Sequence, residues 1–259
     1  LKAAATVYNY FGMQRSSLTS PSALSPYYGD PYIGEGAYLY NGSSTARGDS
    51  GYDTSSTLPG YGSVGFPMNQ VGLDHLLVLE IPAEFNFKVH DLHARLFGDF
   101  AYNLEGAQRA RDAASAYTAV LAQAPNSSVK ASPFSPQTGD VKAYQAGLSV
   151  ASKDGLGLTT GASGKKHAWE IRTFWQHTEQ YALDPNLIDS DTFEGRENLQ
   201  GINLQAALAL TDNLTGMFRY AYATRINHQL GTGGSNPDLP QVNPINEFQM
   251  FQVDLMMKF

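Results

Sequence analysis

Hydrophobic and polar residues alternate along several segments of this chain, most clearly at its C-terminal end. Every second position there is apolar and the positions between are mostly polar, in the run Phe251-Gln252-Val253-Asp254-Leu255-Met256-Met257-Lys258-Phe259. Successive side chains of a β-strand point to opposite faces of the sheet. The pattern therefore predicts a strand with one apolar and one mostly polar face.

The same period of two recurs in other segments of about ten residues, which gives about eight strands in all. These segments lie at 1–11, 77–89, 92–104, 143–150, 169–176, 202–211 and 217–223. Tight turns are expected near His90-Asp91 and at Asp212-Asn213, since Asp and Asn tolerate positive φ. Pro82 has no backbone donor, so a bulge or strand break is expected there.

Long and short connections alternate between these segments. The long ones span 12–72, 106–140, 182–197 and 228–246, and the short ones lie near 91, 153–166 and 212. Outer-membrane barrels have short periplasmic turns and long outer loops, so this rhythm predicts an all-β, antiparallel transmembrane β-barrel. One short loop helix is expected at 107–123, where apolar residues recur at helical spacing. It either packs within its loop or folds into the lumen as a plug.

Composition limits the classes of function. The 259 residues are only 16% charged, against roughly 25% in a typical soluble domain. The net charge of -7 argues against a nucleic-acid partner, and the absence of cysteine excludes a disulfide framework. No run approaches the roughly 18 apolar residues of a spanning helix, whereas strands of about 9–11 residues are long enough to span. We expect a single barrel domain over 1–259.

The terminal Phe259, preceded by apolar residues at every second position, resembles the signal that the barrel-assembly machinery recognises. The last hundred residues also resemble the porins of Gram-negative bacteria. The segments that carry this resemblance are 169–172, 187–193 with Gly195, 198–201, 208–214, 253–255 and 258–259. The resemblance implies a cell outer membrane localisation, with outer-membrane lipid and the assembly machinery as partners. The chain is then the C-terminal part of a larger barrel, or its eight strands close alone.

Charged side chains of the predicted strands fall mainly on the polar face, where they are candidates for lining a pore. They are Glu80, Glu84, Lys88, Arg95, Asp99, Lys142, Glu170, Arg172, Arg219, Arg225 and Asp254. Rings of charge can set the ion selectivity of a channel. The same residues can instead form internal salt bridges in a filled small barrel. Their charges nearly balance and give no firm ion preference.

No motif indicates catalysis or a bound cofactor. The chain has no G-x-S-x-G elbow and no phosphate-binding glycine loop. Asp184, Asp189, Asp191 and Glu194 do not match the spacing of an EF-hand, and we interpret them as a solvated acidic loop. We therefore expect no enzyme activity, no cofactor and no metal site.

These observations predict a porin-like channel for passive diffusion of small polar solutes or ions. The alternative is a structural or adhesive outer-membrane barrel whose long outer loops bind a partner or a glycan. A closed barrel of eight strands is filled by side chains and favours this alternative, whereas a much larger one favours a pore. A barrel enzyme would need a Ser/His or Asp/His pair at the outer rim, and a secreted sandwich would stay in solution without detergent. A homo-oligomer stays open.

Overall fold

The fold is that of a computed structural model, which describes residues 1–10, 75–111, 136, 138–183, 187–188, 192–228, 230, 232 and 245–258. Within these residues the chain forms one antiparallel sheet of nine strands. The strands are β1 (Lys2–Ala3), β2 (Thr6–Asn9), β3 (Leu77–Val89), β4 (Leu92–Asn103), β5 (Lys142–Ala151), β6 (Trp169–Thr178), β7 (Leu199–Ala209), β8 (Leu214–Arg225) and β9 (Glu247–Met257). Two 3-10 helices, η4 (Leu158–Thr160) and η6 (Phe193–Gly195), lie in connections.

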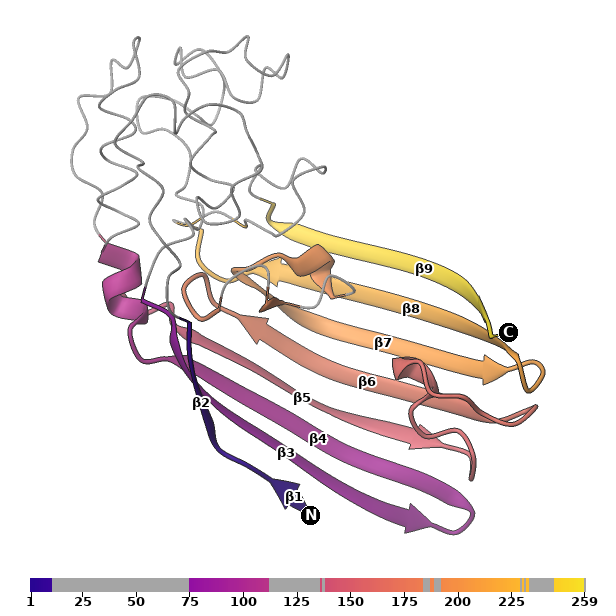
Figure 1. Cartoon of the computed structure of the whole chain (residues 1–259). Helices are drawn as coiled ribbons and strands as arrows, with labels where there is room; N and C mark the ends of the chain where they lie inside the picture. The colour runs from indigo at the N-terminus through magenta and orange to yellow at the C-terminus, as the bar shows by residue number, and fades with distance from the viewer. Residues whose placement is uncertain are drawn as a thin grey trace, which may run out of the picture.

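The strands follow one another across the sheet in the order β1-β3-β4-β5-β6-β7-β8-β9, and β2 also pairs with β3 (Figure 1). Because β1 and β2 lie along the same edge of β3, they act as one interrupted strand. Counted in this way, the described strands agree with the predicted number of about eight. The predicted antiparallel all-β fold is confirmed. Among the described residues, however, the sheet is open: β9 does not pair with β1 or β2.

Pro82 accounts for the interruption of the first strand. The amide of Ala4 donates to the carbonyl of Pro82 at 3.2 Å, so this side of Pro82 faces the N-terminal strands. Proline has no N–H to return the second bond of the antiparallel pair, and β1 and β2 separate at this point. On its other side, β3 pairs with β4 without a gap, Pro82 opposite Asp99. The expected bulge or break at Pro82 is therefore wrong for its own strand, which continues through it, and the interruption lies in the neighbouring N-terminal strand.

The connections predicted to be short or moderate lie at one end of the sheet, and those predicted to be long leave from the other (Figure 1). His90-Asp91 joins β3 to β4, residues 210–213 join β7 to β8, and residues 152–168 join β5 to β6. We call this the short-turn end. The connections after β4, β6 and β8 begin at the opposite end, which we call the long-connection end.

The expected loop helix is described only over residues 106–111, and the rest of it lies outside the described residues. None of the helices in the described part of the chain is long and apolar enough to cross a membrane. The predicted assembly signal Phe259 and the acidic residues Asp184, Asp189 and Asp191 also lie outside the described residues.

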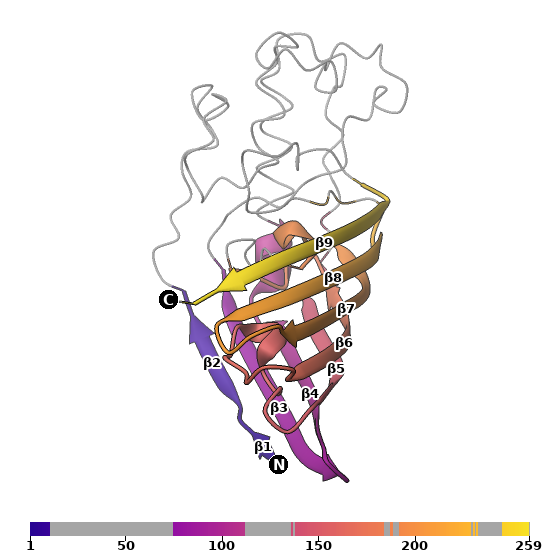
Figure 2. The ribbon, with the colours of Figure 1, turned by 90° about the vertical axis from the view of Figure 1, so that its right-hand side faces the viewer.

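The sheet curves into a trough, with the connections that carry η4 and η6 on its inner side (Figure 2). Large apolar side chains on the convex face are exposed along every strand from β3 to β9: Ile81, Phe85, Leu96, Phe100, Tyr144, Ile171, Trp175, Ile202, Leu208, Tyr222, Phe251, Val253 and Leu255. The exposed fraction rises from 45% at Trp175 in β6 to 65% at Val253, because β9 has a neighbour on one side only.

The buried apolar core lies on the concave face, in clusters toward the two ends of the trough. Leu158 packs on Ala207, Ala209 and Met217 at the short-turn end. At the long-connection end, Phe193 and Phe248 belong to one cluster and Leu76 and Val78 to another. The middle of the concave face, between these clusters, is polar and holds the candidate site.

Candidate functional site

A row of polar side chains crosses the middle of the concave face. The strand register places one residue from each of β3 to β9 side by side: Asn86, Arg95, Ser149, Arg172, Gln205, Arg219 and Gln252. We call this set the arginine row. Its arginines occupy alternate strands, so their Cα atoms stand about 9.5 Å apart. The row crosses the trough in its middle, between the apolar clusters at its two ends.

Arg172 is held between two phenyl rings. Its guanidinium carbon lies 4.5 Å from the ring centroid of Phe97 and 4.8 Å from that of Phe174, distances typical of cation–π contacts. Gly147 stands between the two phenylalanines in register. A Cβ at Gly147 would lie 2.7 Å from Phe97 Cζ, so glycine leaves the room that these rings need.

Arg95 faces a fully buried carboxylate. Its Nη2 lies 3.9 Å from Oε1 of Glu170. Glu170 Oε2 accepts hydrogen bonds from the Gly157 amide at 3.0 Å and from both the amide and the hydroxyl of Thr159 at 2.9 Å. A buried charge needs such compensation. Glu170 therefore fixes the η4 connection to the floor of the trough.

The connection 152–168 folds into the trough at the short-turn end. Leu158 at its centre is fully buried. Lys258, just after β9, donates to the carbonyl of Gly161 at 3.0 Å and to Ser163 Oγ at 2.8 Å. The end of the last strand is thereby tied to a connection from the middle of the sheet.

A hollow of about 510 Å³ lies in the concave face between the arginine row and the long-connection end. Three glutamine side chains line its floor, from β5, β6 and β7. Glu80 and Asp99 form an acidic corner, where their carboxyl groups lie close together. Arg172 and Phe174 line the hollow on the side of the arginine row.

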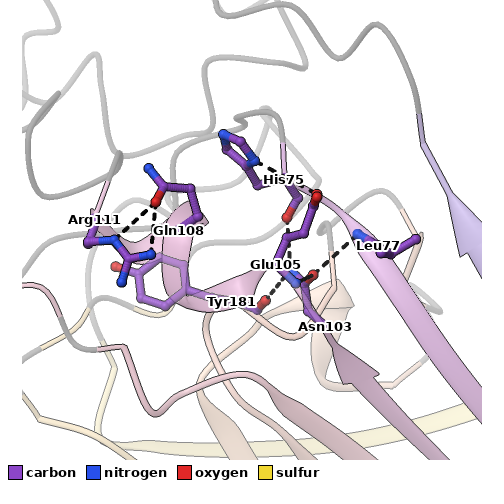
Figure 3. Close-up of polar contacts among 7 residues, drawn as sticks. All are labelled: His75, Leu77, Asn103, Glu105, Gln108, Arg111 and Tyr181. Carbon is purple, nitrogen blue, oxygen red and sulfur yellow. Dashed lines mark hydrogen bonds and ion pairs between the residues drawn. The ribbon is translucent and has the colours of Figure 1, made fainter.

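Asn103 joins three segments at the long-connection end (Figure 3). Its side-chain amide donates to the carbonyls of His75 at 3.1 Å and Tyr181 at 2.9 Å. Its side-chain oxygen accepts from the amides of Leu77 at 3.3 Å and Glu105 at 3.1 Å. All four hydrogen-bonding positions of the asparagine side chain are used, and the side chain is buried.

The pKa values of two acidic groups just outside the strands, Glu179 and Asp140, are shifted in opposite directions. Glu179 accepts from the amide of Lys142 at 2.7 Å and pairs with His177 Nε2 at 3.2 Å. Burial acts to raise the pKa of Glu179, but these hydrogen bonds outweigh it and hold the pKa below its ordinary value. Asp140 accepts from Asn227 Nδ2 at 2.9 Å, yet burial raises its pKa.

All predicted pore-lining residues except Lys142 lie on the concave face. The register pairs Lys142 with Tyr102, on the same face as Tyr144, so the prediction that it lies on the polar face is wrong. It stands an even number of residues from Tyr144, and position along the strand decides the face. The others lie in the arginine row (Arg95, Arg172, Arg219), in the adjacent row toward the short turns (Lys88, Glu170, Asp254), in the acidic corner (Glu80, Asp99), and nearer the sheet edge or end (Glu84, Arg225).

The sequence pattern does not single out the uncharged residues of the site. Phe97, Phe174 and the three glutamines Gln145, Gln176 and Gln205 all occupy inward positions of predicted strands. Alternation alone shows that they point inward. It does not show which of them meet, because that depends on the register between strands.

Among the residues that the structure describes, no three His, Asp or Glu side chains gather in a way that could hold a metal ion. Comparison with known proteins gave no match to a family model, to a curated protein or to a solved structure.

Proposed function

We propose that this chain forms the wall of an outer-membrane β-barrel of the porin type, through which small polar solutes or ions diffuse passively. The observation that supports this most is the contrast between the two faces. Exposed apolar side chains follow every strand from β3 to β9 on the convex face. The middle of the concave face carries the arginine row and the hollow.

The exposed apolar side chains of the convex face favour contact with lipid over contact with water. Apolar surface costs about 25 cal/mol per Å² when it is left in water, and soluble monomers rarely expose contiguous apolar patches above a few hundred Å². In a bilayer the backbone groups of free strand edges also need partners. The edges of β9 and of the β1–β2 strand then pair with one another or with further strands.

The concave face offers a water-filled path with separated charges. Three acidic groups, Glu80, Glu84 and Asp99, lie on β3 and β4, whereas the arginine row continues across β6 and β8. Charged rows at close quarters set which ions enter a pore. The arginine row is therefore the proposed selectivity element.

Planar-bilayer conductance of the purified full-length chain tests the proposal. We expect stepwise, voltage-independent conductance in KCl after insertion from detergent micelles. A chain that stays monodisperse without detergent and gives no conductance would contradict it.

Reversal of charge in the arginine row tests the path itself. Arg172→Glu with Arg219→Glu should shift the reversal potential in a KCl gradient toward cation preference, because the row then attracts cations. Lys142→Glu is the matched control, since Lys142 lies on the other face and should leave the reversal potential unchanged. An equal shift in the control would place the selectivity elsewhere.

A structural or adhesive barrel is the second candidate, and one observation favours it. The connection 152–168 folds into the trough, with Leu158 fully buried and Glu170 fixing it. A barrel filled in this way would not conduct, and its long outer loops would bind a partner or a glycan. A folded, membrane-inserted chain without conductance would support this function.

A further inference from the structure

We propose that the hollow in the concave face binds a zwitterionic solute of the short-peptide class, with its ammonium group at Glu80 and Asp99 and its carboxylate at Arg172. The inference rests on the proposed function, because it names the class of solute that the proposed pore would take.

The acidic corner suits an ammonium group. Glu80 on β3 and Asp99 on β4 bring two carboxyl groups together at the edge of the hollow, and the Tyr8 hydroxyl is hydrogen-bonded to Glu80. Asp99 Oδ1 is buried and has no hydrogen-bond partner among the residues that the structure describes. An ammonium group carries three donors and can serve several of these oxygens at once.

The opposite side of the hollow suits a carboxylate. Arg172 presents a planar guanidinium, which binds carboxylates through parallel hydrogen bonds. The ring of Phe97 at 4.5 Å and that of Phe174 at 4.8 Å fix its position. A fixed guanidinium loses less freedom when it binds than a mobile one would.

The distance between the two charged ends fits a dipeptide. The Arg172 guanidinium stacks on Phe97, and Asp99 is the next inward-facing residue of the same strand. Two residues of a strand span about 6.7 Å. An extended peptide spans about 3.3–3.6 Å per residue, so its two charged ends stand about 7 Å apart when it has two residues.

The floor of the hollow suits a peptide bond. Gln145, Gln176 and Gln205 line it, and each amide can both donate and accept, as a peptide bond requires. Gln205 is only 7% exposed, and its Oε1 accepts no hydrogen bond within the described structure. Buried polar atoms nearly always have partners, so this oxygen is available to a peptide N–H.

An uncharged sugar fits this hollow less well. It could use the three glutamines, but it would leave the acidic corner desolvated without an opposite charge, which is unfavourable. We therefore treat a disaccharide as the competing ligand in the test.

The test is isothermal titration calorimetry on the full-length chain in detergent micelles. The ligands are alanyl-alanine, N-acetyl-alanyl-alanine, alanyl-alanine amide and maltose. We expect the free dipeptide to bind at least about tenfold more tightly than either blocked form, since each lacks one charge-assisted contact. Equal binding of the blocked forms, tighter binding of maltose, or no binding of the dipeptide would overturn the inference.

Two variants assign the ends of the ligand. Asp99→Asn should abolish the preference over the N-acetyl peptide, and Arg172→Gln should abolish the preference over the amide. Asp254→Asn and Arg219→Gln are the matched controls, because both residues lie on the concave face but do not line the hollow. Loss of discrimination in the controls as well would contradict the assignment. If a variant does not fold, the four ligands on the unmodified chain still decide the matter.

Conductance separates this inference from the proposed function. A conducting chain that does not bind the dipeptide would overturn the inference and leave the pore intact. A chain that binds the dipeptide as described but does not conduct would keep the site and overturn the pore.

Discussion

Single buried polar side chains fix the connections of this chain to the sheet. Asn103 and Glu170 are each almost fully buried, and each ties a connection to the sheet through several hydrogen bonds. A buried polar group without its partners costs about 1–3 kcal/mol. Substitutions at these two positions should therefore be felt far more than substitutions at exposed polar positions.

Asn103→Ala should lower the free energy of unfolding by about 2–4 kcal/mol, because two carbonyls and two amides lose a partner together. Urea titration in detergent micelles measures the change. Asn86→Ala is the control, since Asn86 is exposed and donates to Glu84, and it should cost less than about 0.5 kcal/mol. Equal losses in both variants would contradict the role of Asn103.

Glu179 and Asp140 should give opposite dependences of stability on pH. The pKa of Glu179 lies below its ordinary value of 4.5 in the folded chain, so its contribution is complete above that pH and is lost as the pH falls through the folded pKa. Glu179→Gln should cost about 1–2 kcal/mol at pH 7, and the cost should shrink below about pH 4.5.

The pKa of Asp140 is raised above its ordinary value of 3.8, so its contribution is present at low pH and is lost as the pH rises through the folded pKa. Asp140→Asn should therefore gain stability, relative to the unmodified chain, as the pH rises. The change in stability of both variants is measured from the midpoints of urea unfolding between about pH 3 and pH 7, a range that spans the ordinary pKa values of both groups. The same sign of pH dependence in both would contradict this account.

At the residue scale, the sequence predicts which face of the sheet a side chain points to, but not which residues it contacts. The inward position of Arg172 follows from its place in the alternation. Its contact with Phe97 does not, because the two residues are joined only through the register of β4, β5 and β6. For Lys142 the face itself was predicted wrongly. Its charge suggested the polar face, but its position in the strand places it on the convex face.

At the scale of elements, the period of two predicts the strands and the short turns well. The hairpin at His90-Asp91 follows from turn chemistry. The missing N–H of Pro82 interrupts the neighbouring N-terminal strand and not β3, where the break was expected. The inward fold of the connection 152–168 could not be predicted, because it depends on Glu170 meeting Gly157 and Thr159, which no local pattern shows.

Glu170→Gln should loosen that connection. The glutamine amide has a single accepting oxygen, and it loses the charge that faces Arg95. We expect trypsin to cleave at Lys165 or Lys166 at least about tenfold faster, as for a loss of about 1.4 kcal/mol in local stability. Glu84→Gln at the sheet edge is the control. No change in the cleavage rate for Glu170→Gln would contradict an anchoring role.

The two faces of β9 make a further prediction for one element. Val253→Arg places a charge on the exposed apolar face and should lower folding stability in lipid by about 2–4 kcal/mol near the bilayer centre. Gln252→Arg adds the same charge one residue away, on the concave face, and should be tolerated. Folding into lipid vesicles, followed by gel mobility without heating, compares the two. Equal loss in both would argue against lipid contact at Val253.

At the scale of the whole described chain, the structure is an open, curved sheet with an apolar convex face and a concave face that is polar in its middle, between apolar clusters. Several of the inward-facing charges lie in or beside the arginine row, whereas Arg225 lies buried nearer the end of the sheet. The alternation predicted the division between faces. It could not predict that the described sheet remains open between β9 and the N-terminal strands, since closure depends on contacts between chain segments far apart.

Spin-label accessibility along β9 tests the central claim, that the convex face meets lipid, most directly. The chain has no cysteine, so single cysteines at successive positions from Met250 to Leu255 each give one label in vesicle-reconstituted protein. We predict that labels at 251, 253 and 255 collide mainly with lipid-soluble oxygen, and those at 250, 252 and 254 with a water-soluble nickel complex. Water-like accessibility at every position, or no period of two, would contradict the account.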